Sequence, residues 1–276
     1  MNGTPGTAPG GAEQAAERVM ACVPSTRQLR GADVTADAPL VAELAGLIEQ
    51  HGTLYEWAAQ GPQPRALRGR APVFVAALPS GRDTLVVRHA WHGGLLAPVT
   101  GDRFRRPSRA PHEYAMSQQL RAAGVPTTTV LGFARYDAGL GTCRVDVVTR
   151  FVPDAYDLGM VAAGLVPGMQ CAEALTATRR LLAQLAHVGV IHPDLNVKNI
   201  LLTRQTDGAL AAMIIDVDVI RLDARRDPSS TMQANVSRLI RSMRKWRTHF
   251  GCDVSEAMLT HFSNDALTSI RPRAHT

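Results

Sequence analysis

Three polar residues in the second half of the chain, His192, Asp194 and Asn199, have the types and the spacing to do chemistry. They lie in the stretch H-P-D-L-N-V-K-N over residues 192–199, which the apolar residues I-L-L follow at 200–202. A carboxylate such as that of Asp194 can orient an attacking hydroxyl and accept its proton, and an amide oxygen such as that of Asn199 can hold a metal ion that bridges phosphates. The stretch therefore indicates phosphoryl transfer to a hydroxyl, with Asp194 as the catalytic residue.

A second acidic element follows this loop. The residues I-I-D-V-D at 214–218 read as an apolar strand that ends in Asp216. A strand end holds a carboxylate rigidly, and carboxylate oxygens are ligands that Mg²⁺ prefers. The order H-x-D-x-x-x-x-N, strand, Asp is that of the kinase catalytic loop and its D-F-G element, in which Val217 and Asp218 replace Phe and Gly. Each residue alone could cap a turn or end a strand. Their joint order favours a kinase that uses ATP, with Asn199 and Asp216 as ligands of Mg²⁺.

The first half of the chain offers residues that could contact the nucleotide. The only lysines are Lys198 and Lys245, so a phosphate anchor in the first half must be an arginine. The stretch L-V-V-R at 85–88 resembles the V-A-I-K strand of kinases, which makes Arg88 the anchor and Glu113 on the next helix its partner. Both could instead be ordinary surface charges. The motif G-x-G-x-x-G is absent, so backbone contact with phosphates is assigned only to Gly69.

These residues need a scaffold of strands and helices to bring them together. Hydrophobic periodicity and turn residues predict helices at 37–49, 111–123, 172–188 and 233–250 and strands at 71–78, 84–89, 128–136, 144–152, 200–202 and 213–219. The expected fold is α+β and two-lobed, like that of protein kinases, with an antiparallel-sheet N-lobe and a mainly helical C-lobe.

The chain divides into four segments. We expect a disordered leader at 1–17, an N-terminal helical extension at 18–65, an N-lobe with the nucleotide-binding sheet and one helix at 66–152, and a C-lobe with the catalytic loop, the metal-binding aspartate and the C-terminal helices at 153–276.

Composition excludes several other classes of protein. The four cysteines form no C-x-x-C pair, which argues against a zinc site or a disulfide framework and favours the cytoplasm. No apolar run approaches the roughly 20 residues that span a bilayer. The net charge of +6 suits an anionic partner, but aromatic residues make up only 5% of the chain, so a nucleic-acid stacking surface is not expected.

The motifs together resemble one family, the 3-deoxy-D-manno-octulosonic acid (Kdo) kinases of lipopolysaccharide core synthesis. R-H at 88–89 with G-G-L at 93–95 is similar to the R-H-x-x-x-G-G-L stretch of that family. The residues at 192–202 are similar to H-x-D-L-N-x-x-N-I-L-L, and I-D-V-D at 215–218 is similar to I-D-F-D, with Val217 in place of Phe. The resemblance runs from about Leu67 to Trp246, and it gives no motif for the sugar-binding residues.

The resemblance implies a protein-kinase-like fold and a reaction that uses ATP with a divalent metal. The acceptor would be a sugar hydroxyl of a glycolipid, the lipopolysaccharide inner core, at the cytoplasmic face of the inner membrane. It also implies that Asp194 is the base, that Asn199 and Asp216 are metal ligands, and that Arg88 and Glu113 position the nucleotide.

Two alternatives to this reading remain open, a small-metabolite or antibiotic phosphotransferase and a pseudokinase that binds nucleotide without turnover. No A-P-E-like element follows Asp216, which favours a small molecule or a glycolipid over a protein as the acceptor. Basic residues in the predicted helix at 233–250 could contact an anionic membrane or could form a solvated face: Arg238, Arg241, Arg244 and Lys245. Nothing in the sequence bears on oligomeric state.

Overall fold

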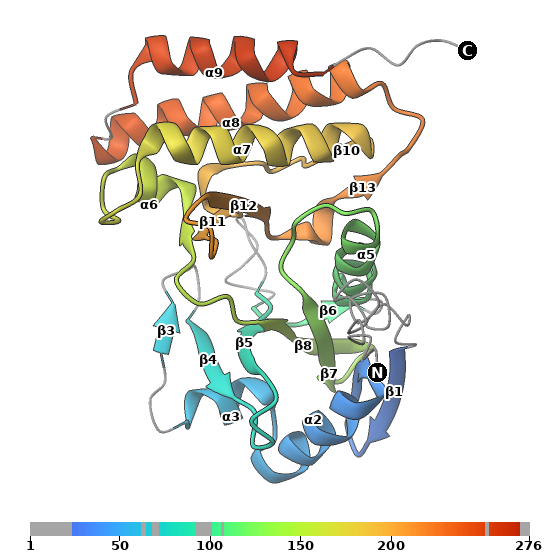
Figure 1. The fold of residues 1–276 in the computed structure, drawn as a ribbon. Coiled ribbons are helices and arrows are strands. Elements are labelled where there is room, and N and C mark those ends of the chain that lie inside the picture. The colour runs from blue at the N-terminus through green and yellow to red at the C-terminus, as the bar shows by residue number, and fades with distance from the viewer. Residues whose placement is uncertain are drawn as a thin grey trace, which may run out of the picture.

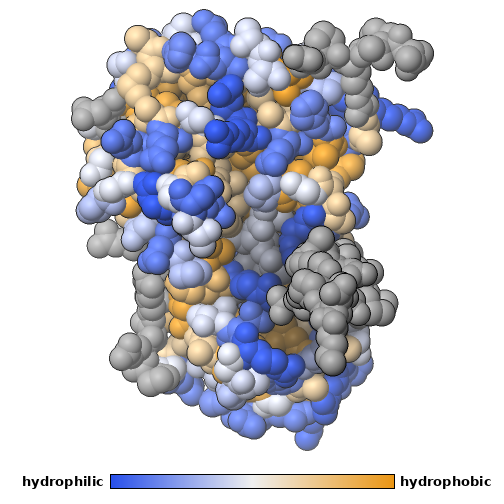
Figure 2. Space-filling model, viewed as in Figure 1, coloured by the Kyte–Doolittle hydropathy of each residue, from blue (hydrophilic) through white to orange (hydrophobic). Residues whose placement is uncertain are grey.

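The computed structural model describes residues 24–61, 65–67, 72–91, 101–105, 108–251 and 254–270. These residues fold into two lobes, one built on an antiparallel sheet and one mainly helical, as Figure 1 shows. The α+β, two-lobed fold expected from the sequence is confirmed. In the space-filling view the surface is hollowed between the lobes, and hydrophilic residues border the hollow (Figure 2).

The sheet lobe combines eight strands with three helices among the described residues. The strands are β1 (Pro24–Leu29), β2 (Ala32–Asp37), β3 (Arg65–Leu67), β4 (Val73–Ala77), β5 (Thr84–His89), β6 (Phe104–Arg105), β7 (Val130–Asp137) and β8 (Thr142–Arg150), and the helices are α2 (Ala38–His51), α3 (Leu54–Ala59) and α5 (Ala110–Ala122). The strand order is β1-β2-β7-β8-β5-β4-β3, and β6 pairs with β8.

Apolar side chains cover both faces of this sheet. Successive residues of a strand point to opposite faces, so Val147 packs beside Tyr114 of α5 while Val148 packs with α2 and α3 on the other face. The same alternation operates in β5, where Leu85 and Val87 are buried in the α2 and α3 cluster. The end of β5 therefore directs its two polar residues to opposite sides of the sheet.

The N-terminal part of the sheet differs from the sequence expectation. The range 18–65 is expected to be a helical extension, but from residue 24 on it also supplies β1 and β2, and β2 pairs with β7. The residues A-D-V-T-A-D at 32–37 give only a weak signal for a strand when read alone, because strand formation depends on the partner strand. Here the partner approaches closely: a Cβ on Gly132 of β7 would lie 2.5 Å from the Thr35 carbonyl oxygen. The predicted leader at 1–17 lies outside the described residues.

The second lobe packs its helices on a small sheet. Its elements are β9 (Tyr156–Asp157), α6 (Leu158–Ala162), α7 (Cys171–His187), β10 (Val190–Ile191), η2 (Val197–Asn199), β11 (Ile200–Arg204), β12 (Leu210–Ile214), η3 (Val217–Val219), β13 (Arg221–Leu222), α8 (Pro228–Phe250) and α9 (Glu256–Thr268). One apolar cluster joins α7, α8 and α9 to β11 and β12. None of the described helices combines the length and the apolar character needed to cross a membrane.

Two predicted boundaries in this lobe change. Helix α8 begins at Pro228 rather than Gln233, because the Asp227 carboxylate accepts a hydrogen bond from the Ser230 amide at 2.8 Å and caps the helix. The strand expected at 213–219 ends at Ile214, and a 3₁₀ turn covers 217–219. The division between residues 152 and 153 stays a prediction.

Candidate active site

Arg88 and Glu113 form an ion pair between strand β5 and helix α5 of the sheet lobe. The Arg88 Nη2 atom lies 2.7 Å from Glu113 Oε1 and 2.8 Å from Oε2. Strand β5 supplies the arginine and the first turn of α5 the glutamate, as the sequence predicts. The Glu113 side chain is 8% exposed and that of Arg88 is 39% exposed. The guanidinium therefore pairs with a buried carboxylate, while the Arg88 side chain as a whole stays partly exposed.

Charge and burial act in opposite directions on this pair. The negative charge of Glu113 raises the pKa of Arg88, and the charges of Asp216 and Asp218 raise it further. Burial raises the pKa of Glu113, while the charge of Arg88 opposes that shift. The Glu113 carboxylate thus depends on Arg88 to remain ionised.

The loop that carries Asp194 is held by the side chains of two asparagines. The Nδ2 atoms of Asn196 and Asn199 each donate to the Asp194 carbonyl oxygen at 2.9 Å. The carbonyl partner fixes the orientation of the Asn199 amide, so its Oδ1 atom is left as a free acceptor. The Asp194 side chain is exposed, and no hydrogen bond or ion pair to its carboxylate occurs in the described structure. It can accept a proton from an incoming hydroxyl.

His192 connects this loop to the segment before Asp216. Its side chain is fully buried, and its Nε2 atom lies 3.3 Å from the Ile215 carbonyl oxygen. Burial lowers the pKa of His192, so the neutral ring donates from Nε2. Its backbone amide donates to Asn235 Oδ1 at 3.1 Å, and Asn235 Nδ2 donates to the Val190 carbonyl oxygen at 2.8 Å. Sequence reasoning assigns no role to Asn235, although an asparagine on the buried side of α8 needs polar partners.

Asp216 has an unusual backbone conformation. Its φ and ψ angles are 62° and 51°, in the left-handed region. A residue other than glycine is strained in this conformation, and strain of this kind concentrates at functional sites. The Ile215 amide donates to the Asn199 carbonyl oxygen at 3.0 Å, which brings the segment before Asp216 beside Asn199. Burial, and then the charge of Asp218, raise the pKa of Asp216. A bound cation would therefore stabilise the ionised form of this carboxylate.

Helix α5 also contacts the second lobe. Arg109 Nη1 lies 3.4 Å from Asp218 Oδ2, and His112 Nε2 lies 2.8 Å from the Ile220 carbonyl oxygen. After the helix, Thr127 Oγ1 donates to the Ile214 carbonyl oxygen at 2.8 Å. These contacts attach the helix that carries Glu113, and the chain just after it, to residues that precede and follow Asp216 in the sequence. Neither Arg109 nor Asp218 is a candidate from the sequence, because only the fold brings them together.

The donor atoms at this site fit a magnesium ion. Mg²⁺ binds oxygen ligands, keeps several waters and is usually held by one or two protein groups together with phosphate oxygens. Asn199 Oδ1 and the Asp216 carboxylate are donors of this kind. In the described part of the chain no three His, Cys, Asp or Glu side chains are close enough to hold a metal by themselves. Gly69 and the G-G-L stretch at 93–95 lie outside the described residues.

A family model for the lipopolysaccharide kinase (Kdo/WaaP) family matches residues 57–262, about three quarters of the chain. The chain belongs to that family. The matched range contains Arg88, Glu113, Asp194, Asn199 and Asp216, and it begins after β1, β2 and α2.

Curated relatives in this family are named 3-deoxy-D-manno-octulosonic acid kinase. The chain is 28% identical to the Haemophilus influenzae protein, over 58% of this chain and 65% of that one, which is less than two thirds of its length. It is 28% identical to the Pasteurella multocida protein over 62% of this chain and 70% of that one. For a Vibrio vulnificus protein the identity is 29%, over 69% of this chain and 77% of that one. A solved structure titled "WaaP in complex with acyl carrier protein" overlaps 75% of this chain and 88% of that one, with a TM-score of 0.42 and 16% identity.

Proposed function

We propose that this family member transfers the γ-phosphate of ATP to a hydroxyl of an inner-core sugar of lipopolysaccharide, with Kdo as the first acceptor to test. One observation carries the proposal: Arg109, at the start of the helix that carries Glu113, lies 3.4 Å from Asp218, and the Ile215 amide donates to the Asn199 carbonyl oxygen at 3.0 Å, next to Asp216. These contacts support a site in which a cation that binds phosphates and a carboxylate that accepts a proton act on the same substrates. Phosphoryl transfer needs both.

Each residue then has a defined role. Asp194 orients the acceptor hydroxyl and takes its proton, because its carboxylate is exposed and unpaired. Arg88 binds the nucleotide phosphates through its guanidinium, while Glu113 accepts hydrogen bonds from the Nη2 atom of that group. Asn199 and Asp216 would hold Mg²⁺, which would supply positive charge that stabilises the transferred phosphate. His192 and Asn235 keep the loop in place and do not touch the substrate.

The surface beside the catalytic loop is suited to an anionic glycolipid. Lys198, in the same loop as Asp194, has its Nζ atom 5.3 Å from the centroid of the Trp246 ring. That ring stacks on Phe250 at 4.1 Å, and Phe250 is 59% exposed. Arg244 and Arg247 of the same helix pair with Glu256. The end of α8 therefore presents an exposed aromatic side chain, that of Phe250, and the basic side chains of the paired Arg244 and Arg247. We infer that this end contacts the acceptor's lipid environment at the cytoplasmic face of the inner membrane.

The proposal is tested by following labelled γ-phosphate from ATP to Kdo-lipid A. The wild-type protein should transfer it with Mg²⁺ present. Asp194→Ala should lower kcat by about 10²-fold or more with ATP binding retained, because it removes a base that acts only in the transition state. Asp154→Ala, an exposed aspartate in the same lobe, is the control.

Two other outcomes would replace this function. Transfer to small aminoglycosides or sugars but not to Kdo-lipid A would make the protein a small-metabolite phosphotransferase. ATP binding without transfer to any acceptor, and without hydrolysis, would make it a pseudokinase.

A further inference from the structure

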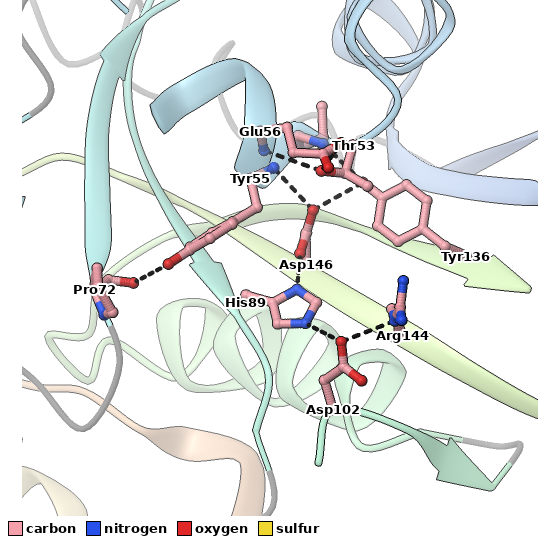
Figure 3. A network of polar contacts seen from close by, with 10 residues as sticks. Thr53, Tyr55, Glu56, Pro72, His89, Asp102, Tyr136, Arg144 and Asp146 are labelled. Carbon is pink, nitrogen blue, oxygen red and sulfur yellow. Dashed lines mark hydrogen bonds and ion pairs between the residues drawn. The ribbon is translucent and has the colours of Figure 1, made fainter. Parts of the chain in front are cut away.

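The histidine next to Arg88 is held between two carboxylates. His89 ends strand β5, and its Nδ1 atom lies 2.6 Å from Asp146 Oδ1 while its Nε2 atom lies 3.1 Å from Asp102 Oδ2. Figure 3 shows the ring between these two side chains. His89 and Asp146 are direct cross-strand partners on β5 and β8. The His89 side chain is 10% exposed and that of Asp146 is fully buried.

The geometry determines the protonation of the ring. A carboxylate can only accept hydrogen bonds, so a ring nitrogen within 3.1 Å of one must carry a proton. Both nitrogens of His89 face carboxylates, which favours the imidazolium form of the ring as long as both carboxylates are ionised. Burial lowers the pKa of His89, but the hydrogen bonds and charges of Asp146 and Asp102 outweigh burial and leave the pKa raised.

Further contacts make this a connected network across the sheet lobe. Asp146 Oδ2 accepts from the Tyr55 amide and from the Tyr136 hydroxyl, both at 2.9 Å, and joins the start of α3 to β7 and β8 (Figure 3). Arg144 Nε lies 2.8 Å from Asp102 Oδ2. Two carboxylates and two cations balance one another, as buried charges require. The Tyr55 ring also lies 5.4 Å from the His89 ring, and in the described part of the chain Tyr55 and Tyr136 are the other titratable groups of this network.

The network fixes the strand end that carries Arg88. Adjacent residues of a strand point to opposite faces, so His89 binds Asp146 on the α3 side while Arg88 reaches Glu113 on the α5 side. Beyond His89, the Ala90 amide donates to the Val145 carbonyl oxygen at 2.8 Å. The His89 contacts therefore hold the backbone from which the Arg88 side chain extends. Productive geometry at such sites is held within about 0.5 Å by supporting residues.

We propose that His89 is a positioning residue for nucleotide binding: as an imidazolium between Asp146 and Asp102, it fixes the end of β5 and thereby the reach of Arg88 toward the nucleotide phosphates. The inference rests on the proposed contact between Arg88 and the nucleotide. Nothing else in the proposed reaction assigns a role to this network.

The first experiment measures protonation without any acceptor. Protein labelled with ¹⁵N-histidine is followed by NMR across pH, and His89→Asn identifies the His89 signals. Both ring nitrogens should carry protons at about pH 8, above the ordinary histidine pKa. In Asp102→Asn the ring should be neutral with its proton on Nδ1, because an asparagine amide can donate to Nε2. Asp83→Asn, which alters the Asp83–Arg150 pair of the same sheet, is the matched control. A neutral His89 ring in the wild type at about pH 7 would overturn the inference.

The second experiment measures the binding of MgATP by calorimetry, which does not depend on the identity of the acceptor. His89→Asn keeps a donor toward Asp146, whereas His89→Gln keeps one toward Asp102. Each should weaken MgATP binding by about tenfold, which corresponds to about 1.4 kcal/mol. His261→Asn, on the exposed face of α9, should leave the affinity unchanged.

The pH dependence separates positioning from a merely structural role. Wild-type MgATP affinity should fall as pH rises through the His89 pKa, because a deprotonated Nε2 would face the Asp102 carboxylate. Asp102→Asn should remove that dependence, since the introduced amide can donate to the neutral ring and accept from Arg144. If the His89 variants lose melting temperature but bind MgATP like His261→Asn, the network is only structural and the inference is wrong. If MgATP binds as expected but no acceptor is phosphorylated, the proposed function fails and this inference stands.

Discussion

Replacing Arg88 by methionine should destabilise the protein in a manner that depends on pH. The substitution keeps an unbranched side chain similar to the aliphatic part of arginine and removes the charged guanidinium, which leaves Glu113 without this partner at 8% exposure. Removing one member of a buried ion pair costs about 3–5 kcal/mol. Because the Arg88 side chain is 39% exposed, solvent already screens part of the interaction, and we expect a loss of about 2 kcal/mol in the free energy of unfolding at about pH 8.

The sign of the pH effect follows from burial of the carboxyl group. Burial raises the pKa of Glu113, and without Arg88 nothing opposes that shift. Between the ordinary carboxyl pKa and the raised one, folded protein then binds more protons than unfolded protein, so stability falls as pH rises through that window. The loss caused by Arg88→Met should therefore be smaller at about pH 5 than at about pH 8.

Urea unfolding at the two pH values measures this effect. Arg88→Lys keeps a cation and should lose less than about 1 kcal/mol at either pH, although it loses the forked geometry suited to phosphate. Glu113→Gln, which retains a buried polar group without charge, should show no extra dependence on pH. An equal loss in Arg88→Met at both pH values would refute the account of Glu113 as a carboxylate that needs Arg88 to stay ionised.

Three further pairs of substitutions, each a test and its control, examine other features. Asp216→Gly should raise stability by about 1 kcal/mol by relieving the positive φ angle and should abolish phosphate transfer, whereas Asp154→Gly, at φ 50°, should stabilise the protein and leave transfer intact. Gly132→Ala should lower the free energy of unfolding by about 2 kcal/mol because its Cβ meets a β2 carbonyl oxygen, and Gly46→Ala in α2, which meets nothing, should not destabilise. Phe250→Ser should weaken sedimentation with phosphatidylglycerol vesicles severalfold, whereas Leu165→Ser, which is also exposed, should not.

The sequence predicts residues with fixed spacing well and contacts across the sheet poorly. Asp194 and Asn199 lie in one short loop, so their relation is local, and the loop geometry follows the motif. The pairing of Arg88 with Glu113 is also predicted, and the structure contains it. The roles of these residues in the reaction, and that of Gly69, stay predictions.

The His89 network shows why the rest could not be predicted. His89 stands next to Arg88 in the sequence, but its chemistry depends on Asp146, and only the register between β5 and β8 places the two side chains together. A one-residue shift of that register would put Asp146 on the other face of the sheet. The β1–β2 hairpin escapes prediction for a similar reason, since β7 supplies its pairing partner. The periodicity does not predict helix α9. Its N-cap residue, Ser255, is nevertheless of a type that begins helices, and its hydroxyl accepts a hydrogen bond from the Met258 amide.

The attachment of α5 to the second lobe bears on how the protein is regulated. In a kinase that is switched by moving this helix, the glutamate leaves its basic partner in the resting state. Here Arg109 and His112 connect the helix to the 3₁₀ turn after Asp216 and to the residue that follows it, while Thr127 anchors the chain after the helix to β12. Withdrawing Glu113 would break all of these contacts together. These contacts predict that Glu113 stays paired with Arg88 as soon as the protein folds, without a separate activation step.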